Sequence, residues 1–222
     1  MNSEIELAYQ NIKSTIPNGV TLVAVSKTKP LNLIQEVYQQ GQRVFGENRV
    51  QELVEKYESL PKDIKWHLIG HLQRNKVKYI ASFVDMIHSI DSERLLDEVN
   101  NSAKKHNRKI NVLLQFHIAQ EETKFGLSRE EAKELIENNA FQSCQNIRVV
   151  GVMGMASFVE DEEQVHREFQ SLKSIFDHLK ASNFKDNAYF KEISMGMSGD
   201  YQIAIEEGST MIRVGSSVFG GR

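Results

Sequence analysis

The feature that most constrains this chain is a regular alternation between short apolar runs and longer amphipathic segments. No linker rich in proline, glycine and serine interrupts it. Several runs, such as Leu22–Val25, are almost continuously apolar, which is typical of parallel strands buried on both faces. Eight runs predict strands, at Thr21–Ser26, Arg43–Phe45, Lys65–Ile69, Val84–Ser89, Ile110–Ile118, Arg148–Met153, Phe190–Ser194 and Thr210–Val214.

The segments between these runs carry apolar residues three and four positions apart, which predicts amphipathic helices. A further helix, roughly Glu4 to Ile16, precedes the first strand. The predicted inward faces include Ile5, Ala8, Ile12 and Ile16 in this first helix, Leu31, Ile34, Val37 and Tyr38 in the next, and Val165, Phe169, Leu172, Phe176 and Leu179 in the longest.

Eight strand-then-helix steps can close as a (β/α)₈ barrel or open as a doubly wound sheet. The strand count favours the barrel. We therefore predict an α/β protein whose residues 1–222 form a single TIM-barrel domain with an extra N-terminal helix.

Composition excludes several functional classes. The net charge of −3 over 222 residues provides no basic field for nucleic acid or an anionic membrane. No apolar run approaches the roughly 20 residues that span a bilayer, and the first ten residues lack a signal pattern. Cys144 is the single cysteine, so no internal disulfide is expected, and we expect a cytoplasmic protein.

Small residues follow the last two predicted strands. The segments Ser194–Asp200 and Gly215–Ser217 offer glycines, hydroxyls and backbone N–H groups. Phosphate sites recur after the seventh and eighth strands of barrels, because such loops bind anions. The alternative interpretation is a pair of tight turns.

Two cations are predicted at the same end of the barrel. Lys27 ends the first strand, and nearby charges such as Lys29 would favour its neutral amine, the nucleophile in Schiff-base formation. Arg213 lies among apolar residues of the last strand and needs a partner or ligand. The alternatives are a solvated lysine at a strand end and a structural ion pair between Arg213 and Glu47.

A lysine, an arginine and a phosphate loop together suggest a phosphorylated aldehyde cofactor, and pyridoxal 5′-phosphate (PLP) has a handle for each. A metal site is not expected. His67 and His71 have a spacing of four, but His67 lies in a predicted strand and Gly70 interrupts the segment.

The sequence resembles the pyridoxal phosphate homeostasis protein family, single-domain relatives of alanine racemase. The similarity runs in order over nearly the whole chain. It is carried by Val23–Pro30, Phe45–Asn48, Trp66–Gly70, His88–Asp91, Lys124–Gly126, Gly151–Met155, Ser194–Asp200 and Ile212–Gly215.

The resemblance implies the racemase-type barrel known as PLP fold type III. It implies that Lys27 holds PLP as a Schiff base and that Arg213 faces the pyridine nitrogen. Asn48 is expected at the ring edge of the cofactor. The residues implied to hold the phosphate are Ser194, Gly215 and Ser216.

Two functions follow from this resemblance. The first is a carrier that maintains PLP homeostasis without robust catalysis and passes PLP to PLP-dependent apo-enzymes. The second is a PLP-dependent amino-acid racemase. Racemisation needs acid and base groups on opposite faces of the substrate, and the second group of two-domain racemases comes from a further domain. We expect no room for that domain after the eighth strand, so we predict the carrier, as a monomer.

Overall fold

All eight predicted strands are confirmed in the computed structural model, which describes residues 4–120, 126–137 and 144–221. Their bounds differ from the predicted ones by a few residues. The strands are β1 (Thr21–Val25), β2 (Val44–Glu47), β3 (Lys65–Leu68), β4 (Met86–Ile90), β5 (Ile110–Phe116), β6 (Ile147–Gly154), β7 (Glu192–Ser194) and β8 (Met211–Val214).

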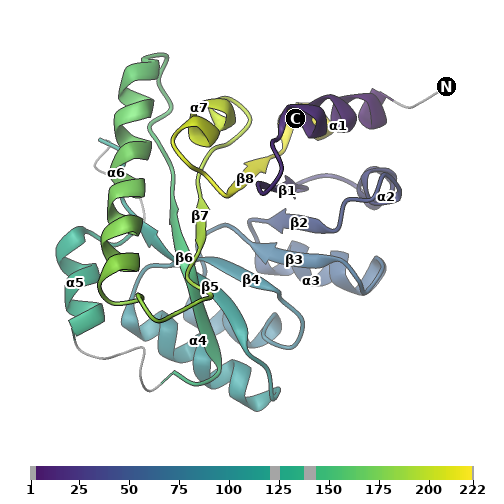
Figure 1. Cartoon of the computed structure of the whole chain (residues 1–222). Helices are drawn as coiled ribbons and strands as arrows, with labels where there is room; N and C mark the ends of the chain where they lie inside the picture. The colour runs from purple at the N-terminus through teal and green to yellow at the C-terminus, as the bar shows by residue number, and fades with distance from the viewer. Residues whose placement is uncertain (1–3, 121–125, 138–143, 222) are drawn as a thin grey trace.

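The strands form one closed barrel and not an open sheet (Figure 1). Each strand is parallel to the next in chain order, and β8 closes the barrel by pairing with β1. The closing register runs from Thr21 opposite Met211 to Ala24 opposite Val214. The carboxyl ends of all eight strands therefore meet at one mouth.

Helices cover the outside of the barrel (Figure 1). The step between β3 and β4 differs, because a 3₁₀ helix replaces the α-helix there. No helix in the described residues is long and apolar enough to cross a membrane. The helices are α1 (Glu4–Thr15), α2 (Leu31–Gln39), α3 (Val50–Ser59), η1 (Arg74–Tyr79), α4 (Glu93–Lys105), α5 (Arg129–Glu137), α6 (Glu162–Ala181), α7 (Tyr201–Glu206) and α8 (Ser216–Phe219).

The predicted N-terminal helix is confirmed as α1, which packs against α2 and α8 near the end of the chain (Figure 1). Its buried residue is Tyr9, which lies on the same helix face as Ile5 and Ile12; these two are partly buried against the core. The phenol of Tyr9 donates to Gln42, which lies next to β2. The predicted inward face was chosen from aliphatic residues and therefore did not include Tyr9.

One predicted inward residue is wrong. The side chain of Leu31 is 41% exposed, whereas Ile34 and Val37 of the same helix are fully buried. Leu31 is the first residue of α2, directly after Pro30. At the first residue of this helix the spacing rule therefore does not predict burial.

The core has two layers because successive strand residues point to opposite faces. A large outer layer fills the space between strands and helices, and a smaller apolar cluster fills the barrel interior. In β1, Ala24 belongs to the outer layer and Val23 to the interior. The same alternation directs Ser26 outward and Lys27 toward the mouth.

Gly151 allows β6 and β7 to approach closely, and its replacement gives a test of the barrel. A Cβ there would overlap the carbonyl oxygen of Glu192 and lie 2.6 Å from its carbonyl carbon. We predict that Gly151→Ala lowers the free energy of unfolding, measured with urea, by about 1–3 kcal/mol. Gly199→Ala is the control, since a Cβ there meets no atom within 4 Å. Equal losses in both variants would contradict the close contact.

Candidate functional site

A cavity of about 830 Å³ opens at the carboxyl ends of the strands. Residues that follow β1, β2, β6, β7 and β8 form its wall. The structure brings five of the six predicted site residues into this wall: Lys27, Asn48, Arg213, Gly215 and Ser216. The sixth, Ser194, is fully buried and is not among the residues that line the cavity in the described part of the chain.

Lys27 reaches the cavity because β1 directs every second residue inward. Val25 also lines the cavity, and Lys27 follows it on the same face. The Lys27 side chain is half-buried, and its amine makes no hydrogen bond or ion pair within residues 4–120, 126–137 and 144–221. The amine is therefore available to a ligand, in contrast to that of Lys29, which donates to the carbonyls of Gly220 and Gly221 at 2.9 and 2.8 Å.

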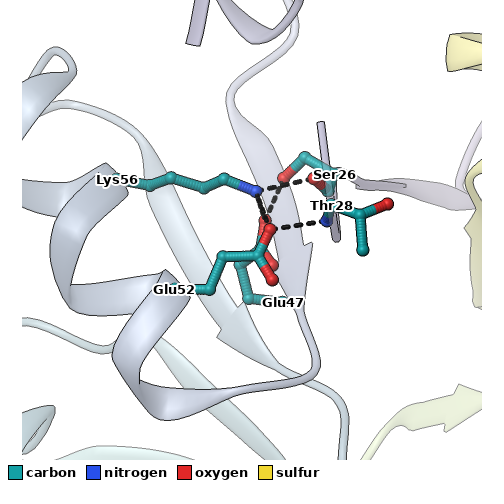
Figure 2. A network of polar contacts seen from close by, with 5 residues as sticks. All are labelled: Ser26, Thr28, Glu47, Glu52 and Lys56. Carbon is teal, nitrogen blue, oxygen red and sulfur yellow. Dashed lines mark hydrogen bonds and ion pairs between the residues drawn. The ribbon is translucent and has the colours of Figure 1, made fainter. Parts of the chain in front are cut away.

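A polar network joins the end of β1 to β2 and α3 (Figure 2). The Lys56 ammonium of α3 donates to the carbonyl of Ser26, to Glu47 and to Glu52, at 2.7, 2.7 and 2.6 Å. The Ser26 hydroxyl also donates to Glu47, at 2.6 Å. These bonds fix the ends of β1 and β2 to α3 and so hold the backbone that carries Lys27.

Thr28 has a left-handed backbone conformation, with φ of 65°. That region is costly for a β-branched residue, by about 1–3 kcal/mol, and persists where surrounding contacts enforce it. Here Glu52 accepts a hydrogen bond from the Thr28 amide at 2.5 Å. The network therefore also holds the turn that follows Lys27.

Glu47 is fully buried, and its second carboxylate oxygen has no hydrogen-bond partner in the part of the chain that the structure describes. Burial raises the pKa of Glu47, and the charge and hydrogen bonds of Lys56 and the Ser26 hydroxyl oppose this rise. The ion pair between Arg213 and Glu47, considered from sequence, is not formed: Glu47 pairs with Lys56.

Arg213 lies inside the barrel, at the floor of the cavity. Its guanidinium donates to Ser194 Oγ at 2.6 Å and to the carbonyl of Gly154 at 3.0 Å. Both acceptors are neutral. Burial lowers the pKa of Arg213 to about 10, against the charge of Asp200, so the side chain remains a cation at neutral pH. An electron-rich ligand atom would be a favourable further partner.

The loops after β7 and β8 form the polar side of the cavity. The amide of Gly215 donates to Ser198 Oγ at 3.2 Å, which joins the two loops. Ser216 begins α8, and the first amides of a helix have no acceptor within it. Sequence reasoning selected Ser194 and missed Ser198. Strand alternation was the available signal for this difference. It directs Ser194, like Arg213, into the barrel interior, whereas Ser198 lies in the loop after β7.

Asn48 follows β2, and a glycine after β3 allows its position. A Cβ on Gly70 would overlap the Asn48 carbonyl oxygen and lie 2.8 Å from Asn48 Cα.

His71, next along the chain, faces Asp91 at 3.4 Å, whereas His67 lies inside the barrel. The two histidines do not share a site, and the described residues contain no cluster of three or more metal-ligating side chains. Lys124 and Phe125 lie outside the described residues.

Removal of Lys56 tests the support behind Lys27. We predict that Lys56→Met lowers the free energy of unfolding by about 3–5 kcal/mol near neutral pH, because it leaves Glu47 charged, buried and unpaired. The raised pKa of Glu47 sets the sign of the pH dependence. The loss is greatest above that pKa and shrinks as falling pH protonates Glu47.

The control is Lys173→Met, which removes an ion pair with Asp177 on the surface of α6. Exposed pairs contribute about 0–1 kcal/mol. Urea unfolding of both variants at several pH values makes the comparison. A Lys56→Met loss that is as small as the control, or that grows at low pH, would be inconsistent with the network.

Comparison with known proteins gives concordant results. The family model described as alanine racemase, N-terminal domain, matches residues 3–222. A pyridoxal phosphate homeostasis protein from Aquifex aeolicus is 42% identical over 206 residues, which cover 92% of this chain and 88% of that protein.

Solved structures agree. PipY of Synechococcus elongatus superposes with a TM-score of 0.91 without PLP and 0.88 with PLP bound, at 33% and 32% identity. Each comparison covers 98% of this chain and all of PipY. An alanine racemase of Clostridium difficile shares the fold, at 16% identity and a TM-score of 0.79 over 59% of its length. This chain therefore belongs to the pyridoxal phosphate homeostasis protein family, whose fold is that of the alanine racemase N-terminal domain.

Proposed function

We propose that this protein binds PLP through a Schiff base with Lys27 and carries it as a reversible store. The observation that carries the proposal is the convergence of three groups on one cavity. These groups are the free amine of Lys27, the buried cation of Arg213, and the hydroxyl- and amide-rich loops around Gly215. When bound, PLP supplies an aldehyde that condenses with a primary amine.

The residues present fit the chemical groups of PLP. The Lys27 amine matches the aldehyde. Ser216, Gly215 and Ser198 provide hydroxyl and amide groups of the kind that bind phosphate. Asn48 supplies an amide for the ring edge. Ser194 would act on the ligand indirectly, because its hydroxyl oxygen accepts a hydrogen bond from the guanidinium of Arg213.

Arg213 explains why such a site would store PLP better than it would use it. A guanidinium can donate a hydrogen bond but not accept one. Against a pyridine nitrogen it keeps that nitrogen unprotonated, and an unprotonated ring withdraws electrons weakly. The site would therefore bind the aldehyde without strongly activating an amino acid.

Two further observations support a carrier that passes PLP to apo-enzymes. Relatives at about 42% identity are named homeostasis proteins, and PipY has been solved with PLP bound. The rim of the cavity is also open: Phe158 is 94% exposed, and Glu160, Ser216 and Gly220 are exposed as well. A ligand held there is accessible to a second protein.

Borohydride reduction followed by peptide mapping tests the attachment site. We predict a pyridoxyl adduct on the peptide that contains Lys27, and at least a tenfold smaller yield in Lys27→Ala. Lys29→Ala is the matched control, because it removes an amine two residues away that is already bound to carbonyl groups. An adduct mainly on another lysine, or equal loss in both variants, would overturn the assignment.

The same proteins separate a carrier from an enzyme. Racemase and transaminase assays on a panel of amino acids should give no turnover above the rate of free PLP. Turnover by the parent protein that disappears in Lys27→Ala but persists in Lys29→Ala would make the protein an enzyme. Gel filtration tests the expected monomer.

A further inference from the structure

A line of polar side chains crosses the interior of the barrel. Asp85 stands at its lower end, just before β4 and 38% exposed, whereas the other members are buried. The line continues through His67 of β3, His88 of β4 and Ser194 of β7 to Arg213, at the floor of the cavity. Apolar residues of the interior, including Val23, Met86, Leu113, Val150, Met153 and Met211, form a separate cluster.

The contacts along this line are continuous. Asp85 faces Nε2 of His67 at 3.6 Å. Nδ1 of His67 lies 2.9 Å from Nε2 of His88, and Nδ1 of His88 lies 3.0 Å from Ser194 Oγ. Arg213 donates to the same Ser194 oxygen at 2.6 Å. Each ring nitrogen thus has one partner along the line.

The two ends of the line fix its direction. Arg213 can only donate, and a carboxylate can only accept. Ser194 accepts from Arg213, which leaves its own proton for Nδ1 of His88. His88 must then carry its proton on Nε2 and donate to Nδ1 of His67. His67 in turn carries its proton on Nε2, where it faces Asp85. The opposite arrangement would place the lone pair of His67 against the carboxylate.

We propose that His67, His88 and Ser194 form a directed hydrogen-bond chain, oriented by the carboxylate of Asp85, that positions Arg213 and couples its hydrogen bonding to protonation at the far end of the barrel. The four residues are positioning residues, since Arg213 alone among the five lines the cavity. The chain itself is a property of the protein without ligand. Only its effect on a bound ligand rests on the proposed function.

A proton entering at His67 would reverse the chain. Asp85 stabilises a doubly protonated His67, and both ring nitrogens of that ring are donors. Nε2 of His88 must then accept, so the His88 proton moves to Nδ1. Ser194 receives hydrogen bonds from both His88 and Arg213. The Ser194 oxygen has two lone pairs and can accept both hydrogen bonds, and its own proton loses His88 as its acceptor. The hydrogen bonding of the residue that holds the Arg213 guanidinium is thereby changed.

The surrounding charges favour this sequence of events. His88 stays neutral, because burial and the charges of His67 and Arg213 hold its pKa well below the usual value. The pKa of Asp85 is lowered, first by its interaction with His67, and Lys65 and Arg108 add to this effect while burial opposes it. The carboxylate is therefore charged over the range in which imidazoles titrate.

Nitrogen-15 NMR of the histidine side chains tests the hydrogen-bond chain in the protein without PLP. At about pH 8 we expect His67 and His88 both to carry the proton on Nε2. As the pH falls, His88 should remain neutral and move its proton from Nε2 to Nδ1. The exposed His106 and His178 provide reference signals. A His88 tautomer that never changes, or independent protonation of both rings, would overturn the proposal.

Two carboxylate variants give a matched comparison. Asp85→Asn should move the midpoint of the His88 switch at least about one pH unit lower, since an opposite charge near His67 is lost. Asp91→Asn should leave the midpoint unchanged, because Asp91 faces His71 instead. Equal shifts in both variants, or no shift in Asp85→Asn, would also refute the coupling.

A second readout distinguishes this inference from the proposed function. With PLP added, the visible absorption should change with the same midpoint as the His88 switch and move with it in Asp85→Asn. Failure to take up PLP would contradict the proposed function but would not affect the NMR test of the hydrogen-bond chain. Uptake of PLP by a protein whose histidines lack the predicted tautomers would refute the hydrogen-bond chain and leave the proposed function intact.

Discussion

The pairing of β8 with β1 is the interaction on which the site depends. It places Val23 opposite Arg213, so the cation from the end of the chain lies beside the strand that leads to Lys27. Parallel strands share one direction, and closure of the barrel brings all their carboxyl ends to one mouth. An open sheet would have left β1 and β8 at separate positions in the order, without this register. The ligand chemistry of the cavity is thus a consequence of backbone hydrogen bonding.

The two faces of β1 carry separate tasks. The inner face presents Lys27 to the cavity with its amine unengaged by any other described residue, and on the outer face Ser26 binds Lys56 and Glu47. The Schiff base proposed for Lys27 needs a fixed backbone and a mobile side chain, and the alternation of a strand provides both. On the far side of the cavity floor, the chain from Asp85 to Ser194 gives Arg213 a similar support. In both cases buried polar groups hold a cation that the ligand would contact.

Sequence patterns predicted what depends on single strands and failed where several elements meet. Apolar runs predicted all eight strands, and the ends of those strands predicted that Lys27 and Arg213 would share a mouth. Lys56 could not be identified, because it is a polar residue of a helix whose burial depends on Glu47 of another strand. Ser194 was expected at the phosphate, whereas in the closed barrel it is buried and accepts a hydrogen bond from Arg213 of the neighbouring strand. The pairing of His67 with His88 likewise needs the neighbouring strands in place.

The central claim is that one cavity holds PLP between Lys27 and Arg213, and a crystal structure of the protein grown with PLP tests it most directly. The account predicts continuous density from the Lys27 side chain to a ring beside Arg213, with the phosphate at Gly215 and Ser216. Density for PLP attached to a different lysine, or in a different cavity, would contradict it.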